Sequence, residues 1–345
     1  MPPIENLSKS ELSALKKRPL RRNFSLDTRY RNFKVEPHLG TEYENGIQIR
    51  DILNASNREE LLLEFAVLVS ERNVFLRSQN ATFDKIAEFA NAFGRASGKS
   101  ATSGLHIHPT AEKTSEFGQL THVISSEKSK TYVGIYNTNS ELHSETWHSD
   151  VTFEPIPSDY AILKIRKSPP EGGDTLWASA YEVTDRNSCR PVLLNLTKAG
   201  IAKINTEHRG APENFGQELT TVHPVIRTNP VTRWKGVFVN NVFTKRINEL
   251  SKDESDFVLR HLFNLTSQNH DFYVSFQWND NDVAVWDNRS SFHTATADFN
   301  ADLYVRFGER ITSLGEKSYL DPNLQSRREA LGILPPVARR THLAA

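Results

Sequence analysis

Two histidines and one aspartate carry the chemistry that can be read most directly from this sequence. His148 and Asp150 lie two positions apart, after Trp147, and His293 follows far downstream. If the first segment is extended, alternate side chains face the same side, so the imidazole and the carboxylate can converge on one ion. Two histidines and one carboxylate leave three positions of a divalent metal open, which is typical of non-haem Fe(II) oxygenases. A closed structural zinc site would require a fourth protein ligand.

Two arginines downstream of His293 supply the second chemical signal. Arg306 and Arg310 lie in the run Tyr304 to Thr312, whose composition favours a strand. Positions i and i+4 of a strand face one side, so both guanidinium groups can point into one cavity. A buried arginine requires an anion, and its planar fork suits a carboxylate or a sulfonate. The pair therefore indicates an anion site beside the metal, with two surface salt bridges as the alternative.

Short strands and a few helices must position these residues. Apolar spacing predicts helices over residues 59–72 and 83–93, and the capping box Ser251-Lys-Asp-Glu254 begins a third helix. Runs rich in β-branched and aromatic residues predict short strands at 74–76, 160–165, 174–177, 222–227, 236–240, 273–278, 283–286 and 304–312. Many short strands with outer helices predict a mainly β fold with peripheral α-helices, an antiparallel barrel or jelly roll.

Composition excludes several classes of protein. The 345 residues include 42 Lys+Arg and 42 Asp+Glu, for a formal net charge of +0. This balance argues against nucleic-acid wrapping and against a polybasic membrane-surface protein. The single cysteine, Cys189, allows no intrachain disulfide, and the N-terminal residues lack the apolar segment of a secretory signal. We expect a cytoplasmic protein without nucleic-acid or membrane partners; a homo-oligomer stays open.

Seven stretches, in order, resemble the taurine/2-oxoglutarate dioxygenase family, especially its fungal sulfonate-dioxygenase-like branch. Together they extend over most of the chain. They are Leu105-His-Ile-His-Pro109, Trp147-His-Ser-Asp-Val-Thr-Phe153, Gly172-Gly-Asp-Thr-Leu-Trp177, His223-Pro-Val-Ile-Arg-Thr228, Phe238-Val-Asn240, Trp286-Asp-Asn-Arg289 and His293 through Arg310. The resemblance implies a double-stranded β-helix (jelly roll) core. We expect an N-terminal arm over residues 1–45, the jelly-roll dioxygenase domain over 46–325 and a C-terminal tail over 326–345.

The resemblance also implies the cofactors and the residues that hold them. His148, Asp150 and His293 match the ligands of Fe(II). Thr175 and Arg306 match the residues that bind 2-oxoglutarate, with Arg306 opposite its distal carboxylate. With O2, such an enzyme decarboxylates 2-oxoglutarate to succinate and CO2 and oxidises a C–H bond of its substrate.

The substrate site follows the family only in part. His108 and Arg310 match the residues that bind the sulfonate of taurine, but Ala111 and Ser144 stand where the family has a tyrosine and an asparagine. We therefore expect a small anionic substrate other than taurine, first a sulfonate or a sulfate ester. The alternative is an amino acid or other carboxylate of specialised metabolism, which is hydroxylated, desaturated or cyclised. A remote alternative is a catalytically silent jelly roll that only binds its ligand.

Residues next to the candidate metal ligands are expected to have structural roles and not to contact the substrate. Trp147 and Trp286 are expected to pack in the core, and His106 is expected to point away from the site because it alternates with His108. Asp287 and Asn288 are expected to stabilise the turn before His293. A hydrogen bond from this turn to a metal ligand is the more specific alternative.

Overall fold

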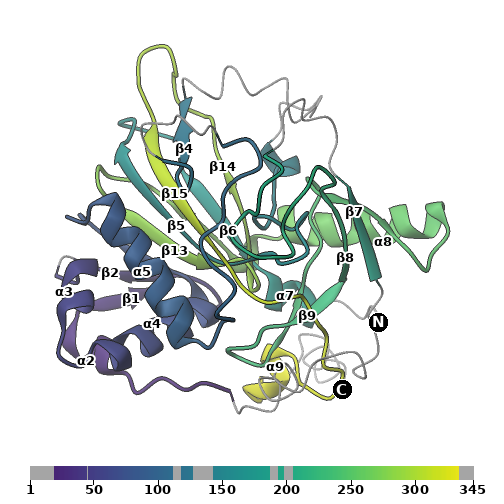
Figure 1. Ribbon diagram of the computed structural model, residues 1–345, viewed down its shortest axis with the longest axis horizontal. Coiled ribbons are helices and arrows are strands. Elements are labelled where there is room, and N and C mark those ends of the chain that lie inside the picture. The colour runs from purple at the N-terminus through teal and green to yellow at the C-terminus, as the bar shows by residue number, and fades with distance from the viewer. Residues whose placement is uncertain are drawn as a thin grey trace, which may run out of the picture.

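Two β-sheets that face each other form the centre of the molecule (Figure 1). The computed structural model describes residues 19–44, 46–111, 118–126, 143–186, 193–197 and 205–333. Within these ranges the larger sheet contains, in spatial order, β1 (Asn32–Lys34), β2 (Thr41–Tyr43), β3 (Val74–Leu76), β13 (Val283–Asp287), β5 (Ser158–Lys167), β15 (Phe307–Leu314) and β4 (His122–Ser125). Its strand pairs are antiparallel except for β2 and β3, which run parallel.

The smaller facing sheet carries much of the candidate site. It contains β12 (Tyr273–Phe276), β6 (Thr175–Ser179) and β14 (Ser291–Ala295), all antiparallel. Aromatic rings fill the space between the sheets: the ring of Trp177 lies 5.1 Å from that of Phe75 and 5.6 Å from that of Trp286. This arrangement confirms the predicted double-stranded β-helix.

Two helices cover the outer face of the larger sheet (Figure 1). They are α4 (Arg58–Arg72) and α5 (Phe83–Ala96), close to the predicted spans. Phe65 of α4 packs edge-on against Phe89 and Phe93 of α5, with ring centroids 4.9 and 5.7 Å apart. Phe93 also meets Tyr160 of β5 at 4.6 Å. Burial of these rings attaches the helix pair to the sheet.

A third helix covers the smaller sheet from outside. α8 (Lys252–Ser267) begins at the predicted capping box, in which the Ser251 hydroxyl accepts from the Glu254 N–H and the Glu254 carboxylate accepts from the Ser251 N–H. Its Leu262 is buried in a cluster with Phe292 of β14. α7 (Ala180–Asp185) follows β6 directly.

The remaining elements are short. They are the strands β11 (Thr244–Ile247), β7 (Leu193–Thr197), β8 (Thr220–Pro224), β9 (Ile226–Thr228) and β10 (Lys235–Val237), the helices α2 (Ser25–Arg29), α3 (Ile49–Asn54) and α9 (Arg327–Ala330), and the 3-10 turns η2 (His143–Glu145) and η3 (His270–Phe272). None of the helices in the described ranges is both long enough and apolar enough to cross a membrane.

Several predicted strands were wrong in extent. Those expected over 236–240 and 273–278 end early, at Val237 and Phe276. The strand expected over 304–312 begins at Phe307, so Arg306 precedes it. The N–H of Tyr304 bonds to the Asn300 carbonyl in a turn instead of a ladder, and the register shifts between Phe307 and Gly308. The strand expected over 222–227 is divided into β8 and β9, which join two different sheets.

Parts of both expected terminal segments lie on the core. Within the expected arm, β1 and β2 belong to the larger sheet, and Leu26 is fully buried. Within the expected tail, Arg327 and Arg328 donate to the buried carboxylate of Glu182 in α7. Residues 1–18, 45 and 334–345 of these segments, and Cys189, lie outside the described residues. The division into an arm, a domain and a tail stays a prediction.

Candidate active site

His148, Asp150 and His293 meet between the two sheets. Their ligand atoms all lie within 4.8 Å of one another. The Nε2 atoms of His148 and His293 each lie 3.8 Å from Oδ1 of Asp150. In the part of the chain that the structure describes, no other group of three such side chains is close enough to hold a metal ion.

Backbone pairing brings the two histidines together. The N–H of His148 donates to the carbonyl of His293 at 3.0 Å, and the N–H of His293 donates back at 2.8 Å. This antiparallel bridge attaches the segment before Asp150 to the edge of β14. As a result, the two imidazole rings lie with centroids 4.3 Å apart.

Asp150 reaches the same point through a turn, not through the alternation of a strand. The expected extended segment is wrong beyond His148, since Asp150 begins a turn. Val151 has φ 62°, a left-handed conformation that β-branched residues rarely adopt. Strain of this kind persists where the surrounding structure enforces it, and here it lies beside a candidate ligand.

The protonation states of the three side chains suit a divalent cation. Burial raises the pKa of the Asp150 carboxyl, but Arg310 and then the two histidines outweigh burial, and the pKa falls to about 2. Burial lowers the pKa of His148 and of His293. Nδ1 of His148 lies 2.7 Å from the Thr146 carbonyl, which places the hydrogen on Nδ1 and the lone pair on Nε2. Neutral imidazoles and an ionised carboxylate are the forms that bind a metal.

A buried cation lies at the start of β6, the central strand of the smaller sheet. Arg306 is 5% exposed; its Nε donates to the Gly173 carbonyl at 2.7 Å and its NH2 group to Oγ1 of Thr175 at 3.0 Å. Burial lowers its pKa to about 10. Among the described residues, Arg306 forms no salt bridge with a carboxylate. A buried guanidinium without a carboxylate is costly, so this site favours an anionic ligand.

Thr175 is oriented to take part in the same anion site. Its Oγ1 accepts from Arg306 and, at 3.1 Å, from the indole N–H of Trp278. With both acceptor positions used, the hydroxyl hydrogen can donate to a ligand. Gly173 permits the close approach: its φ is 69°, and a Cβ there would lie 3.1 Å from Cδ of Arg306.

Arg310 lies between the metal ligands and the edge of the larger sheet. One NH1 atom is 2.8 Å from Oδ1 of Asp150 and 3.5 Å from Nε2 of His293. Its NH2 group is 2.9 Å from Nδ1 of His122. Arg310 and Arg306 therefore serve different places: Arg310 adjoins the metal ligands, and Arg306 adjoins Thr175.

His122 was missed by the sequence analysis. It stands directly opposite Arg310 in the pairing of β4 with β15, and its ring lies 4.6 Å from that of His108. The N–H of Thr110 donates to Nδ1 of His108, which places the His108 hydrogen on Nε2. No sequence signal identified β4 as a strand, so the position of His122 beside Arg310 became evident only from the pairing.

An aromatic wall lies on the other side of His148. The ring of Phe243 packs edge-on against His148 at 6.0 Å and against Phe153 at 5.2 Å. Phe153 is buried. The site thus combines basic groups on one side with apolar groups on the other.

The supporting residues behave largely as expected. Trp147 is buried in the cluster beneath α8, and Trp286 packs its ring 4.8 Å from that of His293. His106 is buried, with Nε2 3.5 Å from the carboxylate of Glu154.

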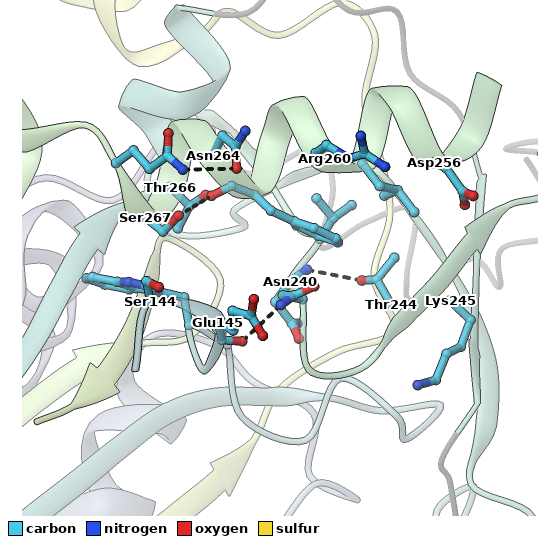
Figure 2. Close-up of a pocket in the computed structure, with 16 residues that line it drawn as sticks. Ser144, Glu145, Asn240, Thr244, Lys245, Asp256, Arg260, Asn264, Thr266 and Ser267 are labelled. Carbon is cyan, nitrogen blue, oxygen red and sulfur yellow. Dashed lines mark hydrogen bonds between the residues drawn. The ribbon is translucent and has the colours of Figure 1, made fainter. Parts of the chain in front are cut away.

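A separate pocket of about 490 Å³ lies between α8 and residues 239–245. Ser144, Glu145 and Arg260 lie on its walls (Figure 2). Trp147 lines it as well, one position before His148 in a segment where neighbouring side chains face opposite ways. The pocket is therefore on the α8 side of this segment, and the triad is on the other side.

Comparisons with known proteins agree with this geometry. A family model described as "Taurine catabolism dioxygenase TauD, TfdA family" matches residues 31–312. An alpha-ketoglutarate-dependent dioxygenase of Neocamarosporium betae is 38% identical, over 92% of this chain and 99% of that protein. An alpha-ketoglutarate-dependent sulfonate dioxygenase of Saccharomyces cerevisiae is 30% identical, over 84% of this chain and 68% of that protein. A taurine dioxygenase structure from Burkholderia xenovorans has a similar fold, with TM-score 0.63 at 21% identity over 84% of this chain and 90% of that chain.

Proposed function

Because this chain belongs to the TauD/TfdA family and is an alpha-ketoglutarate (2-oxoglutarate)-dependent dioxygenase, we propose that it oxidises a C–H bond of a small carboxylate of specialised metabolism. His148, Asp150 and His293 hold Fe(II) in this proposal. Iron, 2-oxoglutarate and O2 supply the oxidising chemistry, with release of succinate and CO2. The presence of all three ligand side chains speaks against a catalytically silent jelly roll.

Arg306 and Thr175 bind 2-oxoglutarate in this proposal. The supporting observation is the buried Arg306 guanidinium, which has no described carboxylate partner and is held in place by Gly173 and Thr175. A dicarboxylate supplies the missing negative charge. The Thr175 hydroxyl adds a donor beside the guanidinium.

Arg310 and His108 bind the anionic group of the substrate, and His122 joins them. Arg310 lies within 3.5 Å of two metal ligands, so an anion held there is close to the metal. The wall of Phe243 and Phe153 then faces the carbon skeleton and excludes water from it. This combination of a charged anchor and an apolar wall orients a C–H bond toward the metal.

Similarity to other dioxygenases favours a carboxylate of specialised metabolism over the sulfonate or sulfate ester that the sequence first suggested. Ala111 and Ser144, which replace the family's tyrosine and asparagine, argue against taurine itself. The N. betae dioxygenase matches nearly end to end, whereas the S. cerevisiae sulfonate dioxygenase matches over two thirds of its length. Sulfonates and sulfate esters remain the second candidate, because a guanidinium also binds those groups.

The test measures succinate formed from 2-oxoglutarate with panels of carboxylates, sulfonates and sulfate esters. We expect coupled succinate release with a carboxylate and none without Fe(II). Arg310→Ala should lower kcat/KM for the acid by roughly 10- to 150-fold, the effect of losing one charge-assisted hydrogen bond, and much less for its methyl ester. Turnover of sulfonates alone would support the second candidate, and equal losses for acid and ester would contradict the anchoring role of Arg310.

A further inference from the structure

Asn288 lies in the turn between β13 and β14 and makes two hydrogen bonds to Asp150. It is 1% exposed. Its Oδ1 accepts from the backbone N–H of Asp150 at 3.0 Å, and its Nδ2 donates to Oδ2 of Asp150 at 3.3 Å. We propose that Asn288 is a positioning residue that makes Asp150 present a single oxygen to the metal. This inference rests on the proposed metal-binding role of Asp150.

The two oxygens of Asp150 have different surroundings. Oδ1 lies 3.8 Å from Nε2 of both His148 and His293, so it faces the point where a metal would bind. Oδ2 faces Asn288. A carboxylate whose second oxygen accepts a hydrogen bond stays oriented with the first oxygen toward the imidazoles.

The orientation of the Asn288 amide is determined by its other partners. Oδ1 also accepts from the indole N–H of Trp286 at 3.1 Å, and Nδ2 also donates to Oγ of Ser158 at 2.8 Å. Two N–H donors at one end of the amide identify that end as the oxygen, so the NH2 group must face Asp150. The backbone N–H of Asn288 donates to the Asp159 carbonyl at 2.7 Å, which anchors the turn on β5.

The same amide connects Asp150 to the support of His293. Trp286, which donates to Asn288, packs its ring 4.8 Å from that of His293. Loss of the amide would therefore release Oδ2 and loosen Trp286 together. A carboxylate free to rotate can offer both oxygens and occupy a position that 2-oxoglutarate requires, because two histidines and one oxygen leave only three positions open.

The test compares Asn288→Ala with Asn229→Ala in the full-length protein. Asn229 is also a buried asparagine, and its side chain donates to Asp287 at 3.0 Å. Among the described residues, the Asn229 side chain forms no hydrogen bond with His148, Asp150 or His293. Affinity for Mn(II) alone and melting temperature without metal are measured for both. We expect Asn288→Ala to weaken Mn(II) binding by about 10- to 100-fold. Asn229→Ala should lower the melting temperature comparably and keep Mn(II) affinity within about threefold of the wild type.

Asn288→Asp provides a second test if Asn288→Ala does not fold. The aspartate keeps the size and both accepted bonds but replaces the donor that faces Oδ2 by an acceptor. We expect its Co(II) absorption spectrum to differ from the wild-type spectrum, since the coordination of Co(II) changes when Asp150 reorients. Wild-type Mn(II) affinity in Asn288→Ala, or a wild-type Co(II) spectrum in Asn288→Asp, would overturn the inference. His148→Ala separates the two proposals: if that variant also bound Mn(II) normally, the metal site itself would be wrong.

Discussion

Some side chains next to the site contact the metal-binding triad directly, and others stabilise the turn that carries those side chains. Asn288 contacts Asp150, whereas the adjacent Asp287 accepts from Ser70, Asn229 and Arg289 in the interior. Arg289 outweighs the burial that raises the pKa of Asp287, so the pKa of this carboxyl is lowered. An ion pair at Asp287 thus stabilises the turn that carries Asn288.

At this scale Arg306 offers a direct test of 2-oxoglutarate binding. Arg306→Ala should weaken 2-oxoglutarate binding to the Mn(II)-loaded enzyme by about 2–4 kcal/mol, or roughly 30- to 700-fold, because a buried carboxylate loses its charged donor. Calorimetric titration measures the change. Arg246→Ala, at an exposed arginine of β11, is the matched control and should bind normally. Normal binding by Arg306→Ala would exclude the assigned role.

At the scale of elements, the smaller sheet is supported from outside by α8. This helix packs on β6, which carries Thr175, and its Leu262 shares a cluster with Phe292, next to His293. Among the described residues, α8 forms no hydrogen bond or ion pair with a side chain of the triad. Its contribution to the site is therefore indirect: it stabilises the sheet, and the sheet places the residues.

Ser251→Ala tests whether α8 stabilises the fold without shaping the metal site directly. Loss of the N-cap hydroxyl should lower the free energy of unfolding by about 1 kcal/mol, in the range 0.5–2. Thermal or urea unfolding measures the loss, while Mn(II) affinity should stay at the wild-type value. Ser267→Ala, near the C-terminal end of the same helix, removes a hydroxyl that donates to the Phe263 carbonyl and should have a smaller effect. A large drop in metal affinity for Ser251→Ala would show that α8 shapes the site directly.

At the scale of the whole molecule, buried ionisable side chains pair with one another through ion pairs and hydrogen bonds. The carboxylate of Glu154 pairs with Arg209, and both side chains are almost fully buried. His223 lies beside this pair, its Nε2 3.1 Å from the Glu154 carbonyl. If a change of pH neutralises one partner of such a buried ion pair, the other partner is left as an uncompensated buried charge. The stability of the fold therefore depends on pH.

His223 makes that sensitivity measurable. Burial, followed by repulsion from Arg227, lowers its pKa to about 3, and Lys317 contributes in the same direction. The unfolded chain takes up this proton near pH 6.5 and the native protein does not. Stability should therefore fall as the pH drops below about 6.5, approaching 1.4 kcal/mol per pH unit for this one group.

The comparison of variants isolates His223 from the other histidines. Melting temperatures of the metal-free wild type, His223→Gln and His261→Gln are measured from pH 7 to pH 4.5. His223→Gln should show a shallower loss of stability, whereas His261→Gln, at an exposed position of α8, should follow the wild type. Identical pH profiles for all three proteins would contradict a neutral buried His223.

Much of the local structure could be predicted because it depends on neighbours in the chain. The helices that became α4 and α5 follow from apolar spacing, and the start of α8 follows from its capping box. Strand ends were less predictable: Arg306 lies before β15 because Asn300 draws the preceding backbone into a turn. β4, with His122, was missed because its pairing with β15 joins residues far apart in the chain.

The residue types of the reaction centre were already evident in the chain, since His148, Asp150, His293 and two arginines have chemistry that does not depend on the fold. Their grouping became certain only in three dimensions, through a two-residue backbone bridge and a turn that carries Asn288. The distances across such contacts depend on pairings between segments that are far apart in the chain. A sequence pattern reports residue types and spacings but not these pairings. The same reason separates Arg306 from Arg310: four positions apart in the chain, they lie beside different groups, Thr175 and Asp150.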